Sequence, residues 1–187
     1  MKEALLFLCN TLFALIVYPL LLRFWMQSLR APFRNPLGEA VLGLTNWIVR
    51  PLRRVIPGLF GLDLATLLAA FVARWLWLLA EWAIIGIAID GAAVLLSVPN
   101  ALLALLKASI YLLMAAVILQ ALLSWLSPHG PMAGVLNALT FRFLRPIRRL
   151  VPLVGGQLDL SPLIVVVLCQ LLLLLPVMWL EQMLRGG

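Results

Sequence analysis

The sequence has little of what most enzymes and metal sites are built from. Charged residues make up 11% of its 187 residues, and it holds one histidine, His129, and two cysteines, Cys9 and Cys169. Each cysteine lies in an apolar segment without a histidine or second cysteine at metal-ligand spacing, which is typical of small buried apolar side chains. The sequence also lacks a Ser–His–Asp or Cys–His arrangement, paired carboxylates in one segment and a glycine-rich phosphate loop. We therefore expect a protein that is not an enzyme and that holds no metal and no cofactor.

What the chain has in abundance is apolar surface. Hydrophobic residues make up 65% of the sequence and its mean hydropathy is +1.12, whereas soluble domains are roughly 45–50% apolar. The net charge of +7 comes from fourteen basic and seven acidic residues. Most of the arginines lie in the windows 23–54 and 142–149, so the positive charge is local. These features indicate a membrane protein and argue against a nucleic-acid partner, because a helix bundle in lipid offers no element that reads a groove.

Four segments are long and apolar enough to cross a bilayer as helices. At 1.5 Å per residue, about 20 apolar residues span the roughly 30 Å hydrocarbon core. The predicted spans are residues 4–22, 64–89, 101–126 and 160–180. The sequence predicts a connector at 91–100, with Ser97 and Pro99 starting the third span. An additional re-entrant or interfacial helix within 85–106 stays open as an alternative.

Two shorter stretches have the periodicity of amphipathic helices. The first opens at Pro36, and Pro51 is expected to end it at Arg50 or to restart it as a new turn, because the residue before a proline resists the α conformation. We expect each helix either to lie along the membrane interface or to pack in the core. The predicted apolar faces are Leu37, Val41, Leu44 and Ile48 in the first and, 95 residues on, Met132, Leu136, Leu139 and Phe143 in the second.

One phrase occurs twice in the chain. RPLRRVIPGLFGLDLATL at residues 50–67 returns as RPIRRLVPLVGGQLDLSPL at residues 145–163, offset by 95 residues at the arginines and by 96 after one extra residue. We infer a tandem duplication with repeats at 1–90 and 101–187. In each repeat the order is span, amphipathic helix, basic turn, span.

Two copies of R-P-[LI]-R-R-x-[VI]-P followed by a glycine-containing link and D-L, each between long apolar segments, resemble the YggT family of small bacterial membrane proteins. The resemblance covers nearly the whole chain. It implies an all-α integral membrane protein of the bacterial inner membrane. It also implies a role in envelope or osmotic stress, or in the assembly of membrane complexes, without specifying a molecular activity.

The basic phrases are the first candidate functional feature. Guanidinium groups suit phosphate, and anionic headgroups at the cytoplasmic leaflet attract basic residues by about 1 kcal/mol each. We expect the acid within each phrase to cap the next helix and to pair with the arginines, closing a clip, with Ser161 as a further cap before Pro162. The clips are predicted to bind membrane lipids or a protein partner, or only to set topology. The clip residues are Arg50, Arg53, Arg54, Asp63, Arg145, Arg148, Arg149, Asp159 and Ser161.

Polar side chains inside the spans are the second candidate feature, because a charge there is costly and commonly functional. At the repeat offset Arg23 aligns with Gln120 and Arg74 with Gln170, while Glu81 lies two turns beyond Arg74. Arg23 is also placed where an interfacial anchor belongs. A seam between the repeats lined by these groups suggests an alternative function as an ion or solute channel formed by a homo-oligomer. A structural hydrogen-bond network between the halves is the other interpretation.

Charge asymmetry predicts the orientation. Segments 30–63 and 127–159 hold nine arginines, whereas the other side has Lys2, Lys107 and Arg185. Lys107 is expected to extend outward along its helix to the interface. The positive-inside rule then places both clips in the cytoplasm and both termini outside. The halves are expected to relate by a pseudo-twofold axis along the membrane normal.

Overall fold

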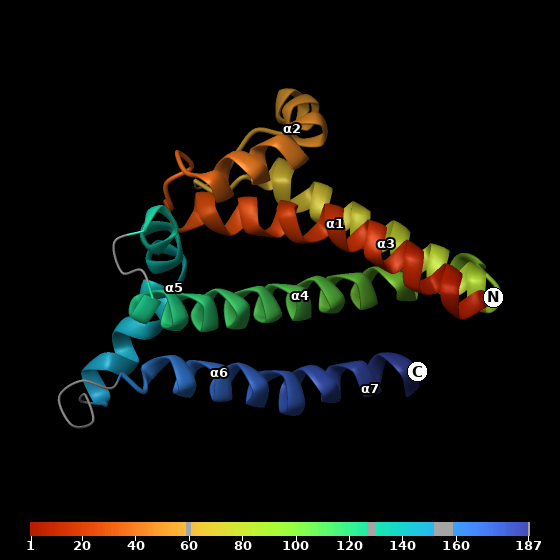
Figure 1. The fold of residues 1–187 in the computed structure, drawn as a ribbon. Coiled ribbons are helices and arrows are strands. Elements are labelled where there is room, and N and C mark those ends of the chain that lie inside the picture. The colour runs from red at the N-terminus through yellow and green to blue at the C-terminus, as the bar shows by residue number, and fades with distance from the viewer. Residues whose placement is uncertain (59–60, 127–129, 152–158, 187) are drawn as a thin grey trace.

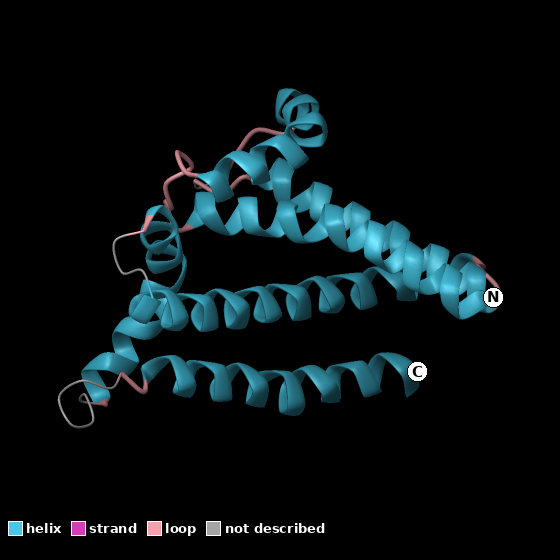
Figure 2. Cartoon of the chain, in the orientation of Figure 1, coloured by secondary structure: helices cyan, strands magenta, loops and turns pink. Residues whose placement is uncertain are grey.

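The computed structural model describes residues 1–58, 61–126, 130–151 and 159–186. Helices are the regular elements of these residues (Figure 2). His129 and the Gly155–Gly156 turn of the second phrase lie outside the described residues. The first repeat comprises α1 (Lys2–Ser28), α2 (Pro36–Val55) and α3 (Leu64–Ile85). The second comprises α4 (Gly91–Leu126), α5 (Pro131–Leu150), α6 (Ser161–Leu172), a π-helical segment η1 (Leu173–Val177) and α7 (Met178–Gly186).

Four helices are long and apolar enough to cross a membrane: α1, α3, α4 and the continuous α6–η1–α7. Helices suit this environment because they satisfy their backbone hydrogen bonds internally. Figure 1 shows α1 and α4 running away from the end that carries both termini, while α3 and α6–α7 return to it. The turns after α1 and α4 lie at the opposite end. The two repeats therefore run in parallel, which confirms the predicted all-α fold of four spans in two repeats.

Equivalent helices make equivalent contacts in the two repeats. In each, the amphipathic helix packs against both spans: α2 on α1 and α3, and α5 on α4 and α6. One apolar core joins α1, α2 and α3 to Leu105 of α4, and a second joins α4, α5, α6 and η1. A third core lies between the repeats, where Met26 and Ala31 meet Val135 and Leu139 of α5. The amphipathic helices are therefore packed elements of the bundle.

The structure corrects the predicted details of α2. Pro51 neither ends nor restarts the helix, which continues to Val55. Its buried face is Val41, Thr45 and Val49, whereas the predicted face residue Leu44 is 56% exposed. The reason is that Thr45 bonds its hydroxyl to the Val41 carbonyl and to a side chain of α1, which turns this row of residues inward. In α5 the predicted Leu136 and Leu139 are buried, and Pro146 likewise lies inside the helix.

The predicted connector at 91–100 is helical, since α4 begins at Gly91 and passes through Pro99. Asp90 Oδ1 accepts a hydrogen bond of 2.7 Å from the Ala93 amide, so the cap lies seven residues before the predicted Ser97. Ser97 is instead fully buried and accepts a bond of 2.6 Å from Trp75 Nε1 of α3. Helix α3 ends at Ile85, four residues earlier than expected, because Gly86 takes the left-handed conformation that ends helices.

Candidate functional site

The first clip closes as predicted, around Asp63. Arg53 Nη2 donates to Asp63 Oδ2 at 2.5 Å and Nε at 3.2 Å. The same carboxylate caps α3 by accepting the Thr66 amide at 3.4 Å and also accepts the Thr66 hydroxyl. When its amide is oriented to suit both partners, Gln27 donates to Asp63 Oδ2 at 2.7 Å and faces Arg53. One buried carboxylate therefore joins the ends of α1, α2 and α3.

The second clip repeats this pairing in a more open form. Arg148 Nε donates to Asp159 Oδ2 at 2.9 Å, and Asp159 Oδ1 accepts the Ser161 amide at 2.9 Å. The prediction that Ser161 caps this helix is wrong. Ser161 is the first residue of α6, and its buried hydroxyl has no hydrogen-bond partner among the described residues. Asp159, two residues earlier, satisfies the free amide instead.

The clips favour ionised carboxylates. Burial acts to raise the pKa of Asp63, but hydrogen bonds from Arg53 and Thr66 and the charge of Arg53 outweigh it and lower that pKa. For Asp159 too, burial opposes ionisation, while the hydrogen bond from the Ser161 amide and the nearby Arg148 lower its pKa. Both acids therefore stay charged at neutral pH and neutralise one arginine each.

The remaining phrase arginines do not pair with the two carboxylates among the described residues. Arg50, Arg54, Arg145 and Arg149 are exposed and form no ion pair within the described part of the chain. Arg145 lies over the ring of Phe141, 5.6 Å from its centroid. Nine arginines and three acids, Glu39, Asp63 and Asp159, occupy segments 30–63 and 127–159, so the clip end carries 9 − 3 = +6. This surface has the charge and the donors to bind phosphate groups.

Arg23 does not act as an interfacial anchor, because it is buried between α1 and α2 and 2% exposed. Its Nη1 donates to Thr45 Oγ1 at 2.7 Å and to Asn46 Oδ1 at 3.1 Å, and its Nε is unpartnered. In the second repeat Gln120 of α4 bonds Thr140 and, at 3.3 Å, Asn137 of α5. The alignment of Arg23 with Gln120 therefore corresponds to one site built twice.

The threonine partners at this repeated site escaped the sequence analysis. Thr45 and Thr140 stand 95 residues apart, which is the offset of the arginine phrases. Both are fully buried and bond the carbonyl four residues earlier. A polar residue at the same place in both copies of an amphipathic helix was the available signal.

The other intramembrane polar residues are not gathered at a seam. Gln170 is exposed on α6, and α6 makes no contact with α3 within the described residues, so Arg74 and Gln170 are apart. Arg74 and Glu81 are both partly buried on α3, and among the described side chains no ion pair joins them. The expectation of a seam between the repeats lined by both Arg74 and Gln170 is therefore wrong. The reason is that α4, rather than α6, packs on α3.

A single ion pair links α4 to the last helix. Lys107 Nζ lies 2.7 Å from Glu181 Oε1, and both side chains are about 30% exposed. Lys107 is thus paired with Glu181, whereas the sequence predicted that it would extend to the interface. Because the partners are 74 residues apart, local sequence gave no sign of the pair.

Comparisons with known proteins place the chain among bacterial relatives. The CCB3/YggT family model matches residues 2–84 and 99–180, one segment in each repeat. A Vibrio alginolyticus protein, named as an uncharacterised protein in the proC 3′ region, is 39% identical over 161 residues, covering 84% of this chain and 85% of the relative. The uncharacterised protein YggT of Escherichia coli K12 is 37% identical over 167 residues, covering 87% of this chain and 83% of the relative. An uncharacterised Pseudomonas aeruginosa protein is 33% identical over 165 residues, with the same two coverages. No solved structure matches the chain.

Proposed function

The chain belongs to the CCB3/YggT family of multi-span membrane proteins, and from this premise we propose that it is a non-enzymatic scaffold or assembly factor that binds anionic lipid headgroups. In this proposal the clip end faces the cytoplasm of a bacterial inner membrane, with both termini outside. The nine arginines at that end and the positive-inside rule support the orientation.

One observation carries the proposal: each clip divides its arginines between two tasks. Arg53 and Arg148 hold the carboxylates that cap α3 and α6, whereas Arg54 and Arg149, one residue on, are exposed. If the clips served only to fasten the helix ends, one arginine in each clip would be enough. If the arginines served only to set the topology, they would need no fixed geometry. The free arginines stand on rigid helices whose ends the paired arginines hold in place. Such a surface suits phosphate headgroups or a partner that carries the same charge.

The adjacent paired and free arginines provide a matched experiment. We expect Arg54→Gln with Arg149→Gln to lower retention of phosphatidylglycerol by roughly thirtyfold, since two basic residues contribute about 2 kcal/mol at an anionic surface. Arg53→Gln with Arg148→Gln removes the same charge one residue earlier. We expect that control to lower thermal stability while the folded fraction retains more lipid. Native mass spectrometry in detergent, with phosphatidylcholine as the zwitterionic comparison, measures retention.

Lysine replacements at the same two free positions separate charge from geometry. They should restore most of the attraction but less of any bidentate phosphate contact. Equal phosphatidylglycerol retention by the wild type and the Arg54 and Arg149 variants would contradict the lipid role and leave topology as the function of these arginines.

A further inference from the structure

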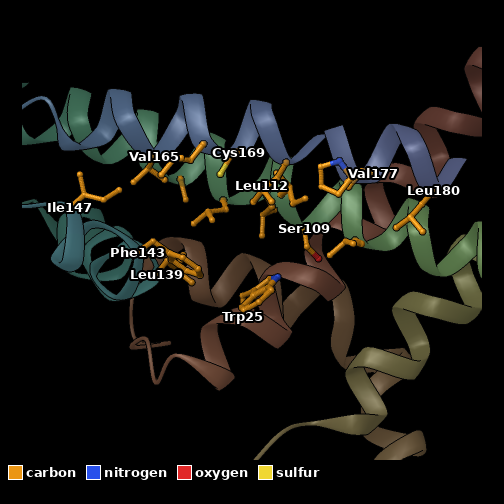
Figure 3. A pocket seen from close by; sticks show the side chains of 17 residues that line it. Trp25, Ser109, Leu112, Leu139, Phe143, Ile147, Val165, Cys169, Val177 and Leu180 are labelled. Carbon is orange, nitrogen blue, oxygen red and sulfur yellow. The ribbon is translucent and has the colours of Figure 1, made fainter. Parts of the chain in front are cut away.

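An apolar groove of about 500 Å³ runs through the second repeat, between α4 and α6–η1–α7 on one side and α1 and α5 on the other. Figure 3 shows aliphatic side chains such as Val165 and Leu112 above it, with Phe143 and Leu139 of α5 and Trp25 of α1 below. Two hydrogen-bond donors in its lining are Trp25 Nε1 and the hydroxyl of Ser109. The Trp25 Nε1 atom is buried without a hydrogen-bond partner among the described residues, and in Figure 3 it points toward the side where Ser109 lies.

The difference between the two repeats explains why this groove is open. Small residues let membrane helices approach closely, and α3 faces α1 with Ala69, Ala70 and Ala73. At the offset of 96 residues, α6 has Val165, Val166 and Cys169 instead. Figure 1 shows α1 and α3 side by side, and α4 runs along α6–α7. Val165 and Cys169 pack against Met114 and Val117 of α4 and also line the groove, which α5 covers only in part.

The size of the groove decides what it can hold. From Val165 to Leu180 is 15 residues, or about 22 Å at the helical rise, which exceeds the ~15 Å of one leaflet of a ~30 Å hydrocarbon core. The volume is within the range of small-ligand sites, about 300–1,000 Å³. A single hydrocarbon chain therefore fits along the groove.

The polar atoms fix the direction of such a chain. Trp25 lies three residues before the end of α1, at the clip end, and Ile147 of the groove precedes Arg148 of the second clip. We propose that the groove binds one acyl chain of a glycerophospholipid from the clip-side leaflet, with an ester carbonyl accepting the Trp25 Nε1 hydrogen. This inference rests on the lipid role proposed above, but it concerns the acyl chain rather than the headgroup charge. The phosphate of that lipid then lies at the end of the groove nearest the arginines of α5.

Filling the groove provides the test. Cys169 is buried and lines the groove, whereas Leu171, on the same helix, is 45% exposed and does not line it. With phosphatidylglycerol added in detergent, native mass spectrometry should show one tightly retained lipid on the wild type and on Leu171→Phe. Cys169→Phe should lower that retention by about tenfold or more, because excluding even about two methylenes from an apolar site has this effect. Trp25→Phe keeps the ring but removes the donor, and it should lower retention several-fold.

Each outcome separates the two proposals. The variant with Arg54→Gln and Arg149→Gln should lose its preference for phosphatidylglycerol over phosphatidylcholine and still retain one lipid. If adding Cys169→Phe removes that lipid, the lipid was bound in the groove. Equal retention by Cys169→Phe and Leu171→Phe would overturn the groove proposal whatever the headgroup result. A second copy of the chain held in place of lipid, and released by Cys169→Phe, would overturn it too. Should Cys169→Phe fail to fold, unchanged retention by Trp25→Phe contradicts the proposed contact.

Discussion

At the scale of single residues, the two clip carboxylates have the same task in different surroundings. Asp63 is 9% exposed and accepts hydrogen bonds from Arg53 and Thr66, whereas Asp159 is 29% exposed and accepts from Arg148 and Ser161. A buried ionised group depends on its partners more than an exposed one, because water can replace fewer of its bonds. The first clip therefore contributes more to the stability of the fold than the second.

We expect Asp63→Ala to destabilise the protein by about 2 kcal/mol, through the lost cap and the buried donors left unpaired. The equivalent Asp159→Ala should cost less, about 0.5–1 kcal/mol, because both partners of that pair are partly solvated. Thermal unfolding of the two variants in the same detergent measures the difference. A larger loss from Asp159→Ala would contradict the ranking.

Acidification should weaken both clips. The pKa values of Asp63 and Asp159 are lowered in the folded protein, relative to about 3.9 in an unfolded chain. The folded state therefore gains stability from these groups above pH ~4 and loses it as the pH falls from there through the lower folded-state pKa. The melting temperature of the wild type should drop over this window. A variant with Asp63→Asn and Asp159→Asn should start lower and change less, and a parallel decline in both proteins would rule out the clips as the cause.

The buried Arg23 can be compared with Gln120, which occupies the equivalent place in the second repeat. Among the described residues no carboxylate lies within ion-pair distance of it, and Gln120 does the same work without charge. We expect Arg23→Gln to be at least as stable as the wild type, because a buried charge is costly. Arg23→Met should cost about 1–3 kcal/mol, since Asn46 loses its donor. Thermal unfolding decides, and a methionine variant as stable as the glutamine variant would contradict this role for the contact.

At the scale of elements, the last span is interrupted and then fastened. The π-helical segment Leu173–Val177 contains Pro176. A proline provides no amide hydrogen for the α-helical ladder, so the regular α-helix is interrupted there. Beyond it, α7 is held to α4 by the Lys107–Glu181 pair. This pair therefore positions the end of the span that the π segment would otherwise leave less constrained.

Removing one partner of this pair should cost more than removing both. We expect Lys107→Leu or Glu181→Leu to lower thermal stability, because each leaves a partly buried charge unpaired in an apolar setting. The double replacement should recover part of the loss. A double-mutant cycle measured by thermal unfolding gives the coupling energy, and strictly additive losses would show that the two groups are independent.

At the scale of the whole molecule, the parallel repeats place both clips at one end and both termini at the other (Figure 1). The proposed orientation, with the nine arginines of the clip end facing the cytoplasm, rests on charge. In intact cells, with Cys9 and Cys169 replaced, Gly58→Cys should be shielded from a membrane-impermeant thiol reagent. Gly91→Cys, where an added Cβ meets nothing within 4 Å, should react from outside. The reverse labelling pattern would invert the topology.

Sequence by itself determined the features that local patterns encode. Span length, the duplicated phrase and the accumulation of arginines are linear properties, and Arg53 pairs with Asp63 only ten residues away. Both clips could therefore be predicted, as could the caps at Asp63 and Asp159. The caps assigned to Ser161 and Ser97 failed, because Asp159 accepts the Ser161 amide and Asp90 accepts the Ala93 amide, each before the predicted cap.

The tertiary structure decided what depends on how each helix is rotated and which neighbour it meets. Thr45 reaches Arg23 across 22 residues of sequence and Lys107 reaches Glu181 across 74. The groove is lined where Val165 and Cys169 of α6 stand at the positions that alanines occupy in α3. In a nearly uniform apolar sequence, many rotations of a helix bury similar surface. Packing between side chains of different size, and the few polar atoms that must find partners, select among them.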